Sequence, residues 1–414
     1  MRLITDFHLH SRFSRACSQD LTLPNIARRC ERKGIQLVGT ADFTHPAWRR
    51  HIGETLEAAT LGTYRLRDGS SPTRFILATE LSSIYKRNEK TRRVHHLVLF
   101  PDLQSVDRFN TSLEKRGSNL RSDGRPILGI DSEELLKLVL DASNQGLLIP
   151  AHAWTPWFSV FGSQSGFDSL EECFGEMTPY VYAIETGLSS DPAMNRRLSA
   201  LDHILLVSNS DAHSLDKLGR EANVFDMDEP SYYELRRILV ERDTTKFLET
   251  IEFFPEEGKY HADGHRACGY WCLPEQTKRH QGLCPKCGKS LTVGVLHRVD
   301  KLADRQRATT APTSVPYRSI VPLAELIAAV VGNGPASKRV KKILDELIAD
   351  GRTEFGVLLD EPESSLSRLA APEIVEAILA MRRGEVVIQP GYDGEYGVVS
   401  VKTGKLPEQV KLGL

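Results

Sequence analysis

The sequence contains no apolar run long enough to cross a bilayer, and the residues after Met1 lack the apolar core of a signal peptide. We therefore expect a cytoplasmic protein with no membrane partner. A strong excess of charge is also missing, since 53 Lys and Arg stand against 55 Asp and Glu. This balance excludes a uniformly basic nucleic-acid-binding surface, so any contact with a polyanion must come from local patches.

Cysteine is scarce over most of the chain. Only seven cysteines are present, and four of them fall between Cys268 and Cys287. Such clustering favours a bound metal in a reducing compartment over the disulfide framework of a secreted protein. Long internal repeats and low-complexity tracts are absent from the sequence.

The length of 414 residues predicts two or three domains. In the first of them, short apolar runs alternate with stretches of helical spacing, which predicts an α/β fold with a largely parallel sheet. The predicted strands are 35–40, 75–78, 96–100, 146–150, 183–185 and 203–207, and the clearest predicted helices are 23–33 and 132–144.

Candidate metal ligands lie at the ends of these strands. His8 and His10 are two residues apart, so on an extended chain both side chains point to the same side and can bind one ion. Asp211 and His213 repeat this spacing after another predicted strand. A lone histidine is more often a structural core residue than a ligand, but the clustering favours ligation.

Four further residues are candidate ligands for which the residues alone leave alternatives open. Glu80 follows the strand 75–78 and, taken alone, is more often a solvated strand-end acid, while His152 follows the strand 146–150. His95 and His96 are neighbours, so alternation allows only one of them to point into the site, and the sequence leaves both open.

With these motifs in order, the first 225 residues resemble the polymerase and histidinol phosphatase (PHP) family of metal-dependent phosphoesterases. The resemblance implies a distorted (β/α)7 barrel with two or three divalent metals, Zn²⁺, Mn²⁺ or Mg²⁺. It implies that His8, His10, Glu80 and Asp211 hold one ion, and that Glu80 bridges to a second ion held by His152 and by His95 or His96. Asp211, Glu80 and His152 are the expected catalytic residues.

The second motif departs from the family pattern. Related enzymes often have Thr-Asp-His, whereas this chain has Phe43 after Asp42. Since phenylalanine cannot ligate, a third ion held by His213 must recruit Asp42 or His45, or be absent. Asp42 is the first choice because it keeps the acid of the motif.

The four clustered cysteines predict a zinc-ribbon-like module. Cys268 and Cys272 are separated by three residues, Cys284 and Cys287 by two, and eleven residues lie between the pairs. Four thiolates leave no open coordination position, so this zinc is structural. His265 or His280 could substitute as a ligand, and two disulfides are the less favoured alternative.

A helical region follows, in which a glycine turn at 332–334 leads into a helix that begins near Lys338 and Arg339. Such a turn can expose backbone N–H groups to a phosphate oxygen, although it can also simply join two helices. The predicted divisions are a barrel (1–225), a connector (226–262), a zinc-binding module (263–299), a linker (300–318) and a helical DNA-binding domain with a hairpin-like tail (319–414).

The order of the barrel, the zinc-binding module and the helical domain resembles that of the endonuclease Q family of DNA-repair nucleases. The resemblance implies a DNA endonuclease that cuts 5′ to uracil, hypoxanthine, xanthine and abasic sites, with a sliding clamp or a helicase as an additional possible partner. The alternatives are a PHP-family small-molecule phosphatase of the histidinol-phosphate type and a non-catalytic helicase-associated adaptor that binds DNA.

To select a damaged base, such an enzyme must flip the nucleotide out of the stack. The segment after His152 is rich in aromatic and small polar residues and is therefore predicted to shape the base pocket, although it could be a packed surface loop. The predicted substrate-binding residues are Trp154, Trp157, Phe158, Phe161, Ser163 and Phe167, together with Lys338 and Arg339.

Overall fold

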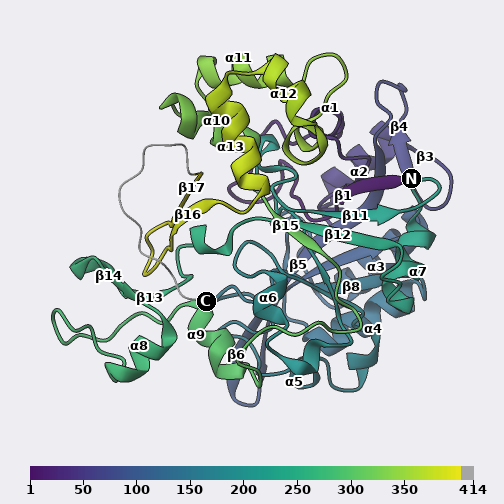
Figure 1. The fold of residues 1–414 in the computed structure, drawn as a ribbon. Coiled ribbons are helices and arrows are strands. Elements are labelled where there is room, and N and C mark those ends of the chain that lie inside the picture. The colour runs from purple at the N-terminus through teal and green to yellow at the C-terminus, as the bar shows by residue number, and fades with distance from the viewer. Residues whose placement is uncertain (402–414) are drawn as a thin grey trace.

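The computed structural model describes residues 1–401, which form a mixed α/β fold around one large sheet (Figure 1). The strand order is β15-β12-β11-β1-β2-β5-β4-β3, with β6 and β7 attached to β5 and β8 attached to β6. The strands are β1 (Arg2–Asp6), β2 (Leu37–Gly39), β3 (Leu56–Ala58), β4 (Tyr64–Leu66), β5 (Arg74–Arg87), β6 (Lys90–Phe100), β7 (Ile127–Leu128), β8 (Leu147–Pro150), β11 (Ala222–Asp226), β12 (Phe247–Glu252) and β15 (Tyr317–Ser319). Positions 402–414 of the predicted C-terminal domain lie outside the described residues.

All six predicted strands are present, as β2, β5, β6, β8, β9 (Ala183–Glu185) and β10 (Leu205–Val207). The last two form a separate parallel pair beside the large sheet. A backbone hydrogen bond of 2.9 Å from Ala153 to Glu185 connects the end of β8 to the end of β9. The carboxyl ends of β1, β8, β9 and β10 therefore open towards a common region.

A largely parallel sheet was expected, but the sheet is mixed. β1, β2 and β5 are parallel neighbours, but β5 and β6 form a long antiparallel hairpin. Its turn residues Asn88 and Glu89 have φ angles of 52° and 59°, the left-handed conformation that two-residue hairpin turns need. The outer part of this hairpin is polar, so the apolar runs alone predicted only its inner halves.

Helices cover the sheet in the first 241 residues. They are α1 (Leu23–Lys33), α2 (Pro46–Thr55), α3 (Leu103–Lys115), α4 (Ser132–Ala142), α5 (Leu170–Phe174), α6 (Pro192–Asn195) and α7 (Tyr232–Glu241), with 3-10 turns η1 (Gly175–Tyr180), η2 (Ser199–Leu201) and η3 (Leu215–Lys217). α1 coincides with its prediction and ends at Gly34, whose φ of 88° favours glycine. α4 begins at Asp131, which accepts a hydrogen bond from the Glu134 N–H, as its capping sequence predicts.

The large sheet continues past residue 225, into segments expected to be a connector and a linker. β12 pairs with β11, and β15 pairs in turn with β12. α7 packs its apolar face into the same core as β1 and β11, with Tyr232, Leu235 and Ile238 buried. These segments complete the sheet because they bury apolar residues that a free connector would expose.

The remaining elements lie at two other places in the molecule. The strands β13 (Asp263–His265) and β14 (Tyr270–Cys272), the helices α8 (Pro274–Arg279) and α9 (Val295–Leu302) and the 3-10 turns η4 (Pro255–Glu257) and η5 (Arg266–Cys268) follow β12. β13, β14 and α8 project to one side of the sheet (Figure 1). The C-terminal region contains α10 (Leu323–Val331), α11 (Lys338–Leu347), a π-helical turn η6 (Gly356–Asp360), α12 (Glu363–Leu369), α13 (Pro372–Arg382) and the hairpin of β16 (Val386–Gln389) and β17 (Val398–Val401).

The C-terminal helices are packed against the rest of the chain. One continuous apolar core includes residues of α1 and of α10, α11 and α13. A buried ion pair of 2.7 Å between Lys33 and Glu354 spans this contact, and Arg29 approaches the same carboxylate. Among the described residues, none of the helices is long and apolar enough to cross a membrane.

Candidate metal centre

The first group of predicted ligands meets where β1 and β10 end. His8 and His10 follow β1, Asp211 follows β10, and a parallel bridge joins the two segments directly after these strands. Glu80 reaches the same point from the middle of β5. One donor atom from each of these four side chains lies within 4.8 Å of the others, and we call them the first donor cluster.

The geometry of the first cluster fits a divalent metal ion. His10 Nε2 lies 3.0 Å from Asp211 Oδ1 and 3.2 Å from Glu80 Oε2. His8 Nε2 lies 3.6 Å from each of the same two oxygens and is buried without a hydrogen-bond partner in the described part of the chain. A buried nitrogen that faces two carboxylates without a hydrogen bond is a site that a cation can satisfy.

Glu80 also belongs to a second donor cluster, with His95 and His152. Its Oε1 lies 2.6 Å from His95 Nδ1 and 3.1 Å from His152 Nε2, while its Oε2 faces the first cluster. Each oxygen of this one carboxylate therefore faces a different cluster. This is the geometry that the bridging role expected of Glu80 requires.

The structure distinguishes the two adjacent histidines of β6. His95 pairs across the hairpin with Ser82 and points towards Glu80, whereas His96 points to the opposite face. There His96 Nε2 lies 2.9 Å from the Ser132 hydroxyl, and its ring packs against Phe174. Because neighbouring side chains of a strand point to opposite faces, His96 is a core residue and not a ligand.

Glu185 is a functional candidate that the sequence reasoning missed. It is the last residue of β9, and its carboxylate lies 2.9 Å from His8 Nδ1 and accepts a hydrogen bond of 2.8 Å from the backbone N–H of His152. A carboxylate only accepts, so this contact places the His8 proton on Nδ1 and leaves Nε2 free as a donor to metal. Its position at the end of a predicted strand, like that of Asp211, was the available signal.

Asp42 and His213, expected at a third metal position, contact His10 and form no additional group of donors within residues 1–401. Asp42 Oδ1 lies 3.4 Å from His10 Nδ1, and its other oxygen accepts a backbone hydrogen bond. The His213 ring lies 4.4 Å from the His10 ring. His45 stacks on Phe13 at 4.4 Å and does not reach these groups. Asp42 and His213 therefore lie beside His10, where His10 Nδ1 and Asp42 Oδ1 are both buried without a hydrogen-bond partner in the described part of the chain.

The electrostatics of the first cluster favour bound positive charge. Burial lowers the pKa of His8, but Glu185, Glu80 and Asp211 outweigh this effect and raise its pKa well above the usual value. The pKa of His10 is raised in the same way. Conversely, burial raises the pKa of Glu80, but the charges of neighbouring cationic groups hold it well below its usual value. Carboxylates that stabilise a proton on an imidazole also stabilise a cation in its place.

The second cluster presents histidine in the form that binds metal. Burial lowers the pKa of His95 to about 4, although Glu80 opposes this shift. His95 is therefore neutral at neutral pH, so an ion would have to displace only the single proton that its Nδ1 directs to Glu80.

The aromatic segment after His152 is largely buried. Trp154, Phe161 and Phe167 are at most 1% exposed, and Trp154 donates a hydrogen bond to Asn195. These three side chains are part of the core and cannot contact a base, which corrects their predicted role. Their aromatic character gave no sign of this, because an aromatic run suits a core and a base pocket equally well.

Of the predicted residues in this segment, Trp157 and Ser163 are exposed and Phe158 is partly exposed. The Trp157 ring is 42% exposed and lies edge-on to Tyr260, with the ring centroids 5.5 Å apart. The carbonyl of Phe158 accepts a hydrogen bond from the backbone N–H of His95, and its ring packs against the His95 ring at 4.8 Å. The loop therefore touches the second donor cluster while it presents one large aromatic ring to solvent.

Arg298 of α9 fixes the conformation of this loop. Its guanidinium donates hydrogen bonds to the carbonyl oxygens of Phe161 and Phe167, at 2.8 and 2.9 Å, and to the carboxylate of Asp168, at 2.7 Å. The Arg298 side chain is buried. The helix that follows the cysteines is thus connected directly to the loop beside the second donor cluster.

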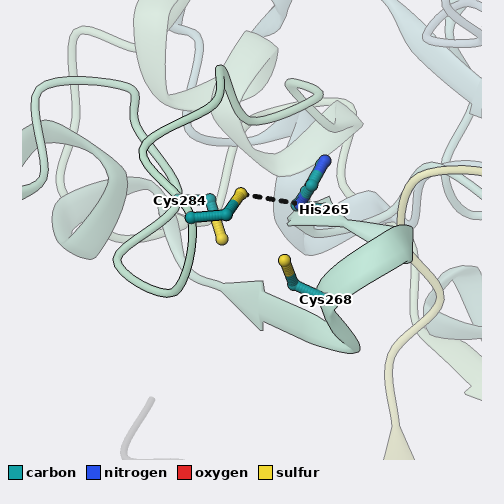
Figure 2. A group of neighbouring side chains, drawn as sticks. His265, Cys268 and Cys284 are labelled. Carbon is teal, nitrogen blue, oxygen red and sulfur yellow. Dashed lines mark hydrogen bonds between the residues drawn. The ribbon is translucent and has the colours of Figure 1, made fainter.

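The cysteine region forms a separate donor group, but not with the four predicted cysteines. One donor atom each from His265, Cys268, Cys284 and Cys287 lies within 4.8 Å of the others. Figure 2 shows the side chains of His265, Cys268 and Cys284 converging, and His265 Nδ1 lies 3.5 Å from Cys287 Sγ. None of the cysteines is in a disulfide within the described residues.

Cys272 lies away from this group because of the register of the hairpin. It pairs with Asp263, whereas His265 pairs with Tyr270 at the turn end, next to Cys268. Two residues along a strand correspond to roughly 7 Å, so Cys272 cannot replace His265 without a change of register. Its buried sulfur lies 3.2 Å from the Thr277 hydroxyl instead. In this donor group, two residues separate His265 from Cys268, and two residues separate Cys284 from Cys287.

Lys338 and Arg339 are exposed at the beginning of α11, where Ser337 caps the helix. The preceding helix α10 ends at Gly332, whose φ of 67° favours glycine. The predicted glycine turn and cationic helix start are therefore present. They lie on the surface, on a different element from both donor clusters.

Comparison with known proteins places this geometry in a family. A model described as the MJ0043 C-terminal domain matches residues 322–385. The uncharacterized protein YqxK of Bacillus subtilis is 32% identical over 388 residues, which cover 92% of this chain and 93% of YqxK. The uncharacterized protein MJ0043 of Methanocaldococcus jannaschii is 33% identical over 262 residues, which cover 62% of this chain. This chain spans only about a third of the length of MJ0043, since the match covers 32% of that protein.

Two crystal structures match almost the whole chain. One is the lesion-specific endonuclease PfuEndoQ from Pyrococcus furiosus, with a TM-score of 0.86 and 32% identity over 97% of this chain and 96% of that one. The other is an endonuclease Q in complex with a 27-mer duplex substrate with an abasic lesion at the active site, with a TM-score of 0.83 and 32% identity over 97% of both chains. Since this identity extends over nearly the full length of each partner, the chain belongs to the endonuclease Q family of endonucleases.

Proposed function

We propose that the chain is a metal-dependent DNA-repair endonuclease with the PHP barrel as its catalytic part. It cleaves the phosphodiester backbone 5′ to uracil, hypoxanthine, xanthine and abasic sites. The observation that carries the proposal is the pair of donor clusters that share Glu80, in a chain that matches endonuclease Q over almost its whole length. The abasic lesion bound at the active site of an endonuclease Q supports the choice of substrate.

Two divalent ions fit the donor clusters. The first cluster would hold one ion, and Glu80, His95 and His152 would hold the other. Imidazole-rich donor sets favour zinc or manganese over magnesium. Such ions neutralise phosphate charge and lower the pKa of a bound water. Glu185 keeps the proton of His8 away from the site, and Asp42 orients His10 from its other nitrogen.

The loop after His152 is proposed to recognise the damaged nucleotide. To be selected, that nucleotide must leave the base stack, and an exposed aromatic ring stabilises it by stacking. Among the predicted aromatic residues, Trp157 has the exposure for this role, and Arg298 holds the loop that carries it. Lys338 and Arg339 at the start of α11 would contact the DNA backbone at a distance from the lesion.

The test compares duplexes that carry one uracil, hypoxanthine, xanthine or abasic site with an intact duplex and with histidinol phosphate. We expect cleavage of the lesion duplexes only, and its loss in Asp211→Ala with DNA binding retained. Equal cleavage of the intact duplex would exclude lesion specificity. Hydrolysis of histidinol phosphate in place of DNA would identify a small-molecule phosphatase, and the absence of hydrolysis of all these substrates would identify a binding adaptor.

We further propose that the cysteine region holds one structural zinc ion through His265, Cys268, Cys284 and Cys287. The convergence of these four side chains supports this ligand set over one with Cys272. Four protein donors leave no open position, so the ion would stabilise the fold of this region.

The zinc proposal predicts opposite results for two single substitutions. We expect His265→Ala to lose most of one zinc equivalent, because three thiolates no longer close the tetrahedron, whereas Cys272→Ser retains it. The measurement is metal content by mass spectrometry, together with the visible spectrum after cobalt substitution. His280→Ala is the matched histidine control, and zinc loss in Cys272→Ser with retention in His265→Ala would restore the four-cysteine site.

A further inference from the structure

Arg125 contacts the donor clusters although no motif of the sequence pointed to it. Its Nη1 donates a hydrogen bond of 2.8 Å to Glu80 Oε2, the oxygen that also faces the first cluster. Arg125 lies two residues before Ile127, the first residue of β7, and β7 pairs in parallel with β5 just after Glu80. A backbone hydrogen bond from Ser82 to the carbonyl of Pro126 continues this pairing. The strand register therefore places the arginine beside the bridging acid.

The loop that carries Arg125 is rigidly attached to the metal centre. The N–H of Gly124 donates to the carbonyl of Phe13, and a Cβ at Gly124 would come within 2.3 Å of both the Asp42 carboxylate and the Ser14 hydroxyl. Only glycine can approach these groups so closely. Asp123 accepts a hydrogen bond of 3.0 Å from the N–H of Arg125 itself. The backbone that carries the guanidinium is thus fixed before any substrate arrives.

Most of the hydrogen-bonding capacity of Arg125 is unused within the described residues. A guanidinium has five N–H donors, and only Nη1 has a partner, Glu80. The side chain is 26% exposed, so the remaining donors are accessible to a ligand. A planar fork with free donors suits the oxygens of a phosphate group.

The charge of the centre is also compatible with a bound anion. Glu80, Asp211, Asp42 and Glu185 supply four negative charges, which balance two divalent cations. Arg125 then adds one positive charge, which Asp123 in the same loop offsets only in part. If cations occupied both clusters, the attraction of Glu80 for Arg125 would be weaker, and the negative charge of a phosphodiester would be attracted to the site.

We propose that Arg125 binds a non-bridging oxygen of the scissile phosphate and stabilises the charge that develops on it during cleavage. This inference rests on the proposed function, because it assumes that a phosphodiester is the substrate. Arg125 moves from Glu80 to the phosphate while its backbone stays fixed by Gly124 and Asp123. It is a substrate-contacting residue in addition to the expected metal ligands.

The first test measures binding of inorganic phosphate to the metal-loaded, DNA-free chain by calorimetry. We expect Arg125→Ala to weaken this binding about tenfold or more, as the loss of a charge-assisted hydrogen bond does. Arg121→Ala removes the same charge from an exposed position four residues earlier and is expected to leave the affinity unchanged. Metal content is measured alongside and should equal that of the unsubstituted chain in both variants.

The second test measures single-turnover cleavage of a duplex with one abasic site. We expect a loss of about 10²- to 10³-fold for Arg125→Ala, in the range seen when one donor to transition-state charge is removed. Arg125→Lys keeps the charge beside Glu80 but loses the forked guanidinium. Its cleavage rate should therefore lie between those of the parent chain and Arg125→Ala.

The two tests separate the inference from the proposed function. Unchanged phosphate affinity and unchanged cleavage in Arg125→Ala, with lesion cleavage intact in the parent chain, would overturn the inference alone. A parent chain that binds phosphate through Arg125 but cleaves no lesion duplex would overturn the proposed substrate and support the anion site.

Discussion

Glu80→Gln is expected to reduce lesion cleavage at least about 10³-fold, the largest effect of any single substitution, because carboxamide oxygens bind divalent cations far more weakly than a carboxylate. Glu80 is fully buried and is the one residue common to both donor clusters, so its charge acts on two ions. The measurement is the single-turnover cleavage rate together with metal content. We expect the metal of both clusters to fall while the zinc of the cysteine region remains.

Glu252→Gln is the matched control for this substitution. Glu252 is also fully buried in the sheet, and burial raises its pKa to about 8. At neutral pH it is therefore mostly protonated, and glutamine has nearly the shape and charge of its neutral form. We expect a cleavage rate within about twofold of that of the parent chain, because one neutral hydrogen-bonding side chain replaces another. Equal losses in Glu80→Gln and Glu252→Gln would show that the first effect is structural.

The second large effect is expected from the two neighbouring histidines of β6. His95→Gln should reduce cleavage about 100-fold or more, because it removes a ligand of the second cluster. His96→Gln should retain most activity and lose about 1 kcal/mol of stability with its hydrogen bond to Ser132. Cleavage rates and thermal unfolding of both variants check these expectations, and the reverse pattern would contradict the side-chain directions described for β6.

The sequence predicted much of the centre because its residues follow strands. His8 and His10 on one face, and Asp211 at another strand end, could be placed by alternation and by the shared edge of a sheet. α1 and the capped start of α4 were predictable for a local reason, since helix ends are encoded within a few residues.

The missed features depend on contacts between distant residues. Arg125 and Glu80 are 45 residues apart, and Glu185 and His8 are 177 apart, so neither pair forms a local pattern. The choice of His265 over Cys272 depends on the register of a short hairpin, which the spacing of cysteines does not report.

The aromatic loop failed as a prediction for a different reason. Trp154 and Phe161 have the composition of a stacking surface, but burial is decided by what packs over them, and here the fold covers both. Trp157, three residues further on than Trp154, stays exposed.

The hydrogen bonds from Arg298 to the loop after His152 have a practical consequence for metal-removal experiments. Arg298 lies on the helix that follows the cysteine region, so if that region holds the proposed zinc, a chelator that removes it should also loosen the loop that packs against His95. Inactivation by chelation should then have two components, one from loss of metal at the donor clusters and one from loss of zinc at the cysteine region. The two should differ in how they depend on chelator strength and time. Adding manganese back would refill the donor clusters at once, whereas full recovery of lesion selectivity would wait for zinc to return and the hairpin to refold.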